Sequence, residues 1–137
     1  MTVVGAALVV VLLLLAAGWA RRRWMIIIVE GPSMAPTLAP GARLIVRRTG
    51  TAPLRVGDVV VAEPPLPGPP RLIVKRVVAV PGDPVPPGIV RGPADVTVPA
   101  GRYLLLGDNP ADSRDSRLFG YVDAERVRGV VVRTLGR

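Results

Sequence analysis

The side chains best suited to chemistry fall in separate stretches of this 137-residue chain. Ser33 is one of only three serines, and the other two, Ser113 and Ser116, lie together far downstream. Lys75 is the only lysine among 18 basic residues. The chain has no His and no Cys, which excludes a Ser-His-Asp triad, a cysteine nucleophile and the usual His/Cys zinc sites. A hydrolase with this composition must therefore use Lys, Asp or Glu as its base.

Lys75 lies inside the apolar segment Leu72–Val80, which is typical of a strand. Side chains alternate between the faces of a strand, so Lys75 and Arg76 must point to opposite sides. A lysine on an apolar face loses hydration, which lowers its pKa and makes the neutral amine available. Arginine keeps its proton. The alternative is an ordinary solvated lysine, but a site that needs only positive charge would be expected to carry arginine, as every other basic site does.

Ser33 and the polar segment Gly107–Arg117 each allow two interpretations. Ser33 could cap a short helical turn over Ser33–Leu38. It could instead be a nucleophile exposed on that turn, with its own N–H helping to hold an oxyanion. Gly107–Arg117 contains the only Asn of the chain. This segment could be a surface loop with local hydrogen bonds, or it could orient a catalytic group and be braced by an Asp–Arg pair.

An uncharged segment, Thr2–Ala20, opens the chain. As a helix its nineteen residues would span about 28 Å, close to a hydrocarbon core of ~30 Å. Trp19 and Trp24 flank the exit as interfacial anchors do. A cleaved signal peptide is the alternative, but its first residues would need positive charge. We expect a retained single-pass anchor over residues 1–24 and one catalytic domain over residues 25–137.

The frequent Gly and Pro, 15 and 16, and the scarcity of aromatic residues predict short strands joined by turns. The net charge of +8 could indicate nucleic acid or an anionic membrane surface. Most of the arginines are scattered and no aromatic platform is interleaved with them, so we do not expect nucleic-acid binding. The expected strands are Met25–Val29, Arg43–Arg47, Val59–Ala62, Leu72–Val80, Val96–Val98, Arg102–Leu106 and Arg128–Thr134.

Three stretches together resemble the successive boxes of type I signal peptidases, which are membrane-anchored serine proteases with a Ser–Lys dyad. They are Ser33–Leu38, Lys75–Asp83 and Gly107 through Gly120, in the order of that family. The resemblance covers roughly residues 25 to 134. It implies a mainly β fold, the signal-peptidase/LexA-like catalytic core of coiled antiparallel sheets. The short connection between the second and third boxes implies a minimal core without a cap domain.

The resemblance also implies roles for individual residues. Ser33 would attack the scissile carbonyl, and neutral Lys75 would take its proton and later activate water. Ser113 would hydrogen-bond the Lys75 amine and orient it. Asp115 would pair with Arg117 and brace the loop.

Substrate contacts are implied as well. Val29, Met34, Leu38 and Val74 would line shallow apolar pockets that accept small residues at the first and third positions before the cut, the Ala-x-Ala pattern. The substrate would lie extended beside the strands. The implied partners are precursor proteins with signal or leader peptides and the lipid bilayer. No metal or organic cofactor is implied, and the oligomeric state is left open.

The sequence leaves alternatives open for the orientation of the protein in the membrane and for its range of substrates. The resemblance places the catalytic domain on the outer face of a prokaryotic plasma membrane, which we favour, but Arg21–Arg23 favour the cytoplasm. A cytoplasmic domain would suit a protease dedicated to the leader of one substrate. A self-cleaving LexA-type relative could use Pro99–Gly101. A membrane-tethered β-domain without catalysis would make the Ser and Lys pattern coincidental.

Overall fold

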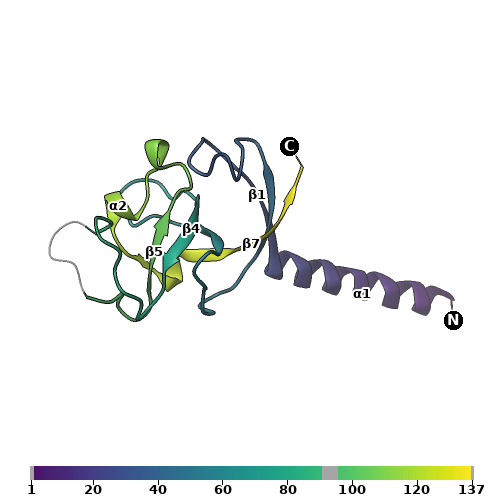
Figure 1. Cartoon of the computed structure of the whole chain (residues 1–137). Helices are drawn as coiled ribbons and strands as arrows, with labels where there is room; N and C mark the ends of the chain where they lie inside the picture. The colour runs from purple at the N-terminus through teal and green to yellow at the C-terminus, as the bar shows by residue number, and fades with distance from the viewer. Residues whose placement is uncertain (1, 91–95, 137) are drawn as a thin grey trace.

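A long N-terminal helix projects from a β-rich body in this computed structural model, which describes residues 2–90 and 96–136 (Figure 1). The helix, α1, covers Thr2–Arg23, and none of its 22 residues is buried. At a rise of 1.5 Å per residue it is about 33 Å long. It is the one helix among the described residues that is long and apolar enough to cross a membrane.

The body is a seven-stranded sheet in the order β1-β2-β7-β3-β4-β5-β6, and every neighbouring pair is antiparallel. The strands are β1 (Trp24–Ile28), β2 (Arg43–Arg47), β3 (Val59–Ala62), β4 (Ile73–Ala79), β5 (Arg102–Leu106), β6 (Val122–Asp123) and β7 (Val127–Leu135).

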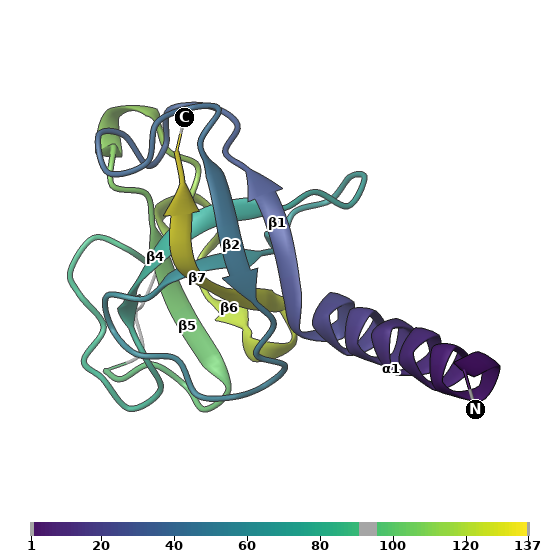
Figure 2. The same cartoon turned by 90° about the vertical axis from the view of Figure 1, so that its right-hand side faces the viewer.

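The sheet is strongly curled, as Figure 2 shows. Register shifts interrupt the β2–β7, β3–β7 and β4–β5 pairs, and such bulges bend strands and increase their twist. Gly129 of β7 packs against the end of β2, the strand that pairs with β7, and a Cβ there would collide with the carbonyl oxygen of Arg47. The curl brings β1, at one edge of the sheet, and β4 to opposite walls of one cleft.

The central strands are buried on both faces. Val60 packs in one core cluster with Val77 and Leu105, and Val61 packs in another with Leu44. Alternate residues of β3 therefore face two different cores. This explains why every residue of the strand is apolar and why apolar and polar residues do not alternate along it. A third cluster forms around Leu104, Ala79, Ile89 and Val98.

The expectation of a mainly β fold after one N-terminal helix is confirmed. Six of the expected strands are present within one or two residues of their predicted bounds. Val96–Val98 is not a strand, because Thr97 forms only a single bridge to Pro84 and Val96 is 88% exposed. Ser33–Leu38 is a turn, without a helix.

The downstream polar loop contains two short helical segments, η1 (Pro110–Asp112) and α2 (Ser116–Phe119). A third such segment, η2 (Ala124–Arg126), precedes β7. The division into an anchor over residues 1–24 and a catalytic domain over residues 25–137 stays a prediction.

Candidate active site

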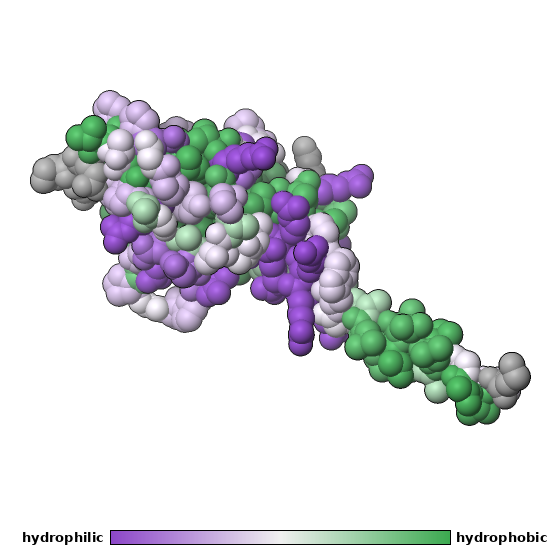
Figure 3. Space-filling model, turned by 90° about the horizontal axis from the view of Figure 1, so that it is seen from below, coloured by the Kyte–Doolittle hydropathy of each residue, from purple (hydrophilic) through white to green (hydrophobic). Residues whose placement is uncertain are grey.

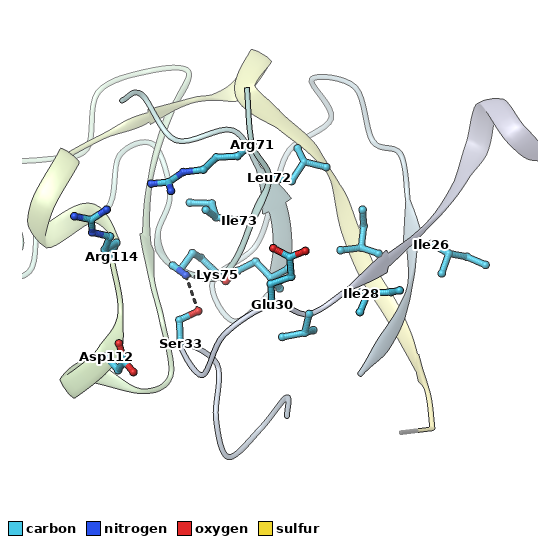
Figure 4. A pocket seen from close by; sticks show the side chains of 13 residues that line it. Ile26, Ile28, Glu30, Ser33, Arg71, Leu72, Ile73, Lys75, Asp112 and Arg114 are labelled. Atoms are coloured by element: carbon cyan, nitrogen blue, oxygen red, sulfur yellow. Dashed lines mark hydrogen bonds between the residues drawn. The ribbon is translucent and has the colours of Figure 1, made fainter. Parts of the chain in front are cut away.

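Ser33 and Lys75, 42 positions apart in the sequence, meet in the folded chain. Lys75 Nζ lies 2.8 Å from Ser33 Oγ, and Figure 4 shows the two side chains pointing toward each other. Ser33 lies in the turn between β1 and β2, and Lys75 lies in β4. The two residues that the sequence selected as nucleophile and base are therefore within hydrogen-bond distance.

Lys75 is nearly excluded from solvent, with 4% of its surface exposed. It shares the buried face of β4 with Val77 and Ala79, whereas Arg76 lies half-buried on the other face. Burial removes the hydration that favours the ammonium form and so lowers the pKa of the Lys75 amine, and the negative charge of Asp115 partly opposes that shift. Nζ also lies 3.2 Å from the carbonyl oxygen of Val74.

Asn109 holds the turn that carries Ser33. Its backbone N–H donates to the carbonyl of Ser33 at 2.9 Å, and its side-chain amide donates to the carbonyl of Pro32 at 3.1 Å. In a trans peptide the C=O and the following N–H point in opposite directions. Fixing the Pro32 carbonyl therefore directs the Ser33 N–H away from the Asn109 loop.

A buried carboxylate, Asp115, braces the loop beside the dyad. It accepts hydrogen bonds from the Gly107 N–H at 3.0 Å, from Ser113 Oγ at 2.7 Å and from Arg117 Nη2 at 2.7 Å. Burial alone would raise its pKa, but hydrogen bonds from Arg117, Gly107 and Ser113 outweigh burial and lower the pKa to about 2. Asp115 is therefore a fixed negative charge near Lys75, as the ion pair with Arg117 requires.

Ser113 has a different partner from the one expected. Its hydroxyl donates to Asp115, and the expected hydrogen bond to Lys75 is not among those formed by residues 2–90 and 96–136. Ser113 still lies close to the dyad, and Gly107 lies between it and Ser33. A Cβ on Gly107 would collide with Ser113 Oγ and would lie 2.6 Å from the Ser33 carbonyl oxygen. Only a glycine allows this close approach.

Arg76 and Asp108 form a second brace, which was not predicted from the sequence. Arg76 donates from Nε and Nη2 to the two carboxylate oxygens of Asp108, at 2.9 and 2.7 Å, and from Nη1 to the carbonyl of Gly57. The Arg76 hydrogen bond lowers the pKa of Asp108, and a hydrogen bond from Thr37 adds to it. The signal that could have found this pair is the position of Asp108, two residues after the end of β5, since β5 pairs with the strand that carries Arg76.

A cleft of about 690 Å³ opens over the dyad, and Figure 4 shows the side chains that line it. One wall comes from β1 and the residues that follow it, and the other comes from the start of β4. The lining residues are Ile26, Ile27, Ile28, Val29, Glu30, Ser33, Arg71, Leu72, Ile73, Val74, Lys75, Asp112 and Arg114. Apart from Lys75, four of these residues carry charged side chains, and none of the four was singled out from the sequence: Glu30, Arg71, Asp112 and Arg114.

Of the four residues predicted to contact substrate, Val29 and Val74 line this cleft. Met34 does not, because the turn after Ser33 points its side chain into the core, where it is fully buried. Leu38 is also buried and borders a separate depression beside Asp58. The part of the chain that the structure describes contains no group of three or more Asp and Glu placed to hold a metal ion.

Comparison with known proteins decides the family. A family model described as signal peptidase, peptidase S26, matches residues 2–87 and 89–135. The chain belongs to the signal peptidase family, peptidase S26. This confirms the resemblance stated above and, with it, the predicted class of serine endopeptidase.

Two curated relatives and one solved structure are similar to this chain. Mitochondrial inner membrane protease subunit 1 of Schizosaccharomyces pombe is 32% identical over 109 residues, which are 77% of this chain and 69% of that protein. Signal peptidase I of Leptolyngbya laminosa is 30% identical over 131 residues, 76% of this chain and 64% of that protein. The crystal structure of a signal peptidase I from Enterococcus faecalis V583 aligns with a TM-score of 0.49 and 23% identity, over 61% of this chain and 100% of that chain. The chain thus spans about two thirds of the length of these curated relatives.

The Asp115 brace gives a prediction about stability. Its pKa in the folded state is about 2, below the ordinary value of 3.8. The ionised form therefore stabilises the fold above pH 3.8, and this stabilisation is lost as the pH falls toward 2. We expect Asp115→Asn to lower the free energy of unfolding at pH 7 by roughly 2 kcal/mol. Denaturant unfolding over a pH series measures this.

The matched control is Asp112→Asn, which removes an exposed carboxylate of the same region. It should change the free energy of unfolding by less than about 0.5 kcal/mol. The difference in the free energy of unfolding between wild type and Asp115→Asn should become smaller as the pH falls from 4 to 2. A difference that stays constant over that range would show that the charge of Asp115 contributes nothing.

Proposed function

We propose that this protein is a membrane-bound endopeptidase that removes N-terminal signal or leader peptides after small residues, at sites of the Ala-x-Ala type. Ser33 is the nucleophile and Lys75 is the general base. The observation that supports this best is the 2.8 Å distance between Ser33 Oγ and the buried Lys75 amine. Membership of the signal peptidase family supports the substrate class.

The chemistry needs only these two side chains and one backbone donor. Neutral Lys75 accepts the Ser33 hydroxyl proton while Oγ attacks the scissile carbonyl carbon. The Ser33 N–H stabilises the oxyanion of the tetrahedral intermediate. The Lys75 ammonium then gives its proton to the leaving amine, which frees the mature protein and leaves an acyl group on Ser33. Lys75 next takes a proton from water, and the resulting attack releases the signal peptide and returns the proton to Ser33.

The loop residues Ser113, Asp115 and Arg117 position this dyad. The Asp115 charge attracts the Lys75 ammonium that forms when the proton is transferred, and it opposes the effect of burial on that group. The hydrogen bonds from Ser113 and Arg117 hold the carboxylate in place. Burial makes the amine a base, and Asp115 keeps the cost of protonating it low enough for turnover.

Two open strand edges suit an extended substrate. β1 is an edge strand of the sheet. β5 pairs with β4 only from Arg76 onward, so Ile73–Lys75 lack a partner on that side among the described residues. Both edges border the cleft, and a peptide could add to them as a further strand. Val29 and Val74 would then form the apolar walls that favour small side chains.

A separate part of the proposal concerns which membrane holds the protein and on which side of it the catalytic domain lies. The apolar α1 and the family both support a membrane protein. We propose a prokaryotic plasma membrane with the catalytic domain, residues 25–137, on the outer face and residues 1–24 as the anchor. Arg21–Arg23 at the end of α1 favour the opposite orientation, which would suit a protease dedicated to one cytoplasmic leader.

Cleavage of an Ala-x-Ala precursor tests the dyad. Ser33→Ala, Lys75→Ala and Lys75→Arg should each lower kcat/KM by roughly 10³-fold or more, because arginine cannot serve as a base. The wild-type rate should rise with pH through the lowered pKa of Lys75, since only the neutral amine accepts a proton. Initial rates on a purified precursor in detergent measure both.

Arg114→Gln serves as the control, because it removes a charge from the same cleft without touching the dyad. It should keep most of the wild-type kcat. An active Lys75→Arg variant would disprove the role of Lys75, and cleavage at sites without small residues would disprove the proposed specificity.

Membrane orientation can be measured with single cysteines, because the chain has none of its own. Arg55→Cys lies exposed on the β body, and Thr2→Cys lies at the far end of α1. On intact bacterial spheroplasts a membrane-impermeant maleimide should label Arg55→Cys and spare Thr2→Cys. The reverse pattern would place the catalytic domain in the cytoplasm and favour the dedicated leader protease.

A further inference from the structure

A second, mostly apolar groove lies at the junction of α1 with the sheet, and we call it the junction groove. Its volume is about 770 Å³, and its apolar walls include Trp24, Ile26, Ile45 and Val132. Three of these are well exposed, with Trp24 at 39%, Ile26 at 66% and Val132 at 51%. Apolar side chains this exposed indicate a surface that contacts something other than water.

Arginines mark the same groove. Arg21 and Arg133 line it, and its lining contains no acidic residue. Neither arginine belongs to any of the four ion pairs formed within residues 2–90 and 96–136. Figure 3 shows hydrophilic side chains gathered where the hydrophobic α1 meets the body. The groove therefore combines an apolar floor with two uncompensated positive charges.

The position of the groove favours a lipid as its occupant. It begins at the last turn of α1, whose length matches the hydrocarbon core. Trp19 and Trp24 border that turn, and the Arg23 guanidinium stacks over the Trp19 ring at 5.3 Å, an arrangement typical of the headgroup region. A phospholipid offers both of the chemistries that the groove presents, an acyl chain and a phosphate.

We propose that the junction groove binds an anionic phospholipid of the bilayer that holds α1. The phosphate lies between Arg21 and Arg133, whose planar guanidinium groups suit phosphate oxygens. The upper part of an acyl chain lies against Trp24, Ile26 and Ile45. Since Ile26 also lines the catalytic cleft, the bound lipid contacts the strand that forms one wall of that cleft. This inference rests on the proposed membrane anchoring, and it is independent of the cleavage chemistry.

Native mass spectrometry of the full chain, released from neutral detergent micelles, tests the proposal. Phosphatidylglycerol or phosphatidylcholine is titrated in, and the Ser33→Ala background keeps the readout independent of cleavage. We expect the first phosphatidylglycerol to bind more tightly than phosphatidylcholine. Arg21→Gln/Arg133→Gln should weaken phosphatidylglycerol binding by roughly 30-fold, since each basic side chain at an anionic surface contributes about fivefold in affinity.

The control variant Arg55→Gln/Arg126→Gln removes the same charge from outside the groove. It should keep the wild-type affinity and preference. Equal binding of the two lipids by the wild-type chain, which requires no variant, would overturn the proposal. Equal losses in both double variants would also overturn it, because they would reflect net charge alone. A chain that does not stay in micelles would contradict the anchoring, and that outcome is visible before any lipid is added.

Discussion

The Lys75 amine lies almost fully out of water and within 2.8 Å of the Ser33 hydroxyl, and the site depends on that burial. An exposed lysine would be an ammonium at neutral pH and could accept no proton. Burial favours the neutral form, so one side chain can do the work that an imidazole does in other serine proteases. In a chain without His or Cys this is the route that the composition leaves open.

The rest of the structure keeps that amine buried and correctly placed. The curl of the sheet brings β1 and β4 to one cleft. The Arg76–Asp108 pair ties the loop after β5 to the strand that carries Lys75, and the Asp115–Arg117 pair braces that loop internally. Asn109 fixes the carbonyls of Pro32 and Ser33, and Gly107 allows the loop to approach without a steric clash. Several parts of the fold therefore contribute to the placement of Ser33 Oγ and Lys75 Nζ.

Much of this could be predicted from local sequence, because alternation and turn residues determine short strands. Six strands followed from such signals, whereas the Ser33–Lys75 pairing followed from the composition of the chain and from the family resemblance. Val96–Val98 resembled a strand, but among the described residues it forms no more than the single bridge from Thr97 to Pro84. The Arg76–Asp108 pair and the burial of Met34 depend on which strands pair and which way a turn faces. Those are tertiary properties that a single sequence does not encode locally.

The side-chain partner of Ser113 is another feature that could not be predicted from the local sequence. The family motif implied a hydrogen bond between Ser113 and the Lys75 amine, but the Ser113 hydroxyl donates to Asp115. The carboxylate is the stronger acceptor, and it already collects donors from Gly107 and Arg117. The loop is therefore organised around the buried Asp115 charge, which acts on Lys75 through space.

Titration of Lys75 itself tests the central claim most directly, and a chain with one lysine makes this straightforward. Labelling with ¹³Cε-lysine gives a single side-chain resonance, whose chemical shift follows the protonation of Nζ. The structure predicts a midpoint clearly below the ordinary value of 10.5, because burial disfavours the ammonium. A midpoint at or above 10.5 would mean that the amine is not available as a base, and it would contradict the account of this site.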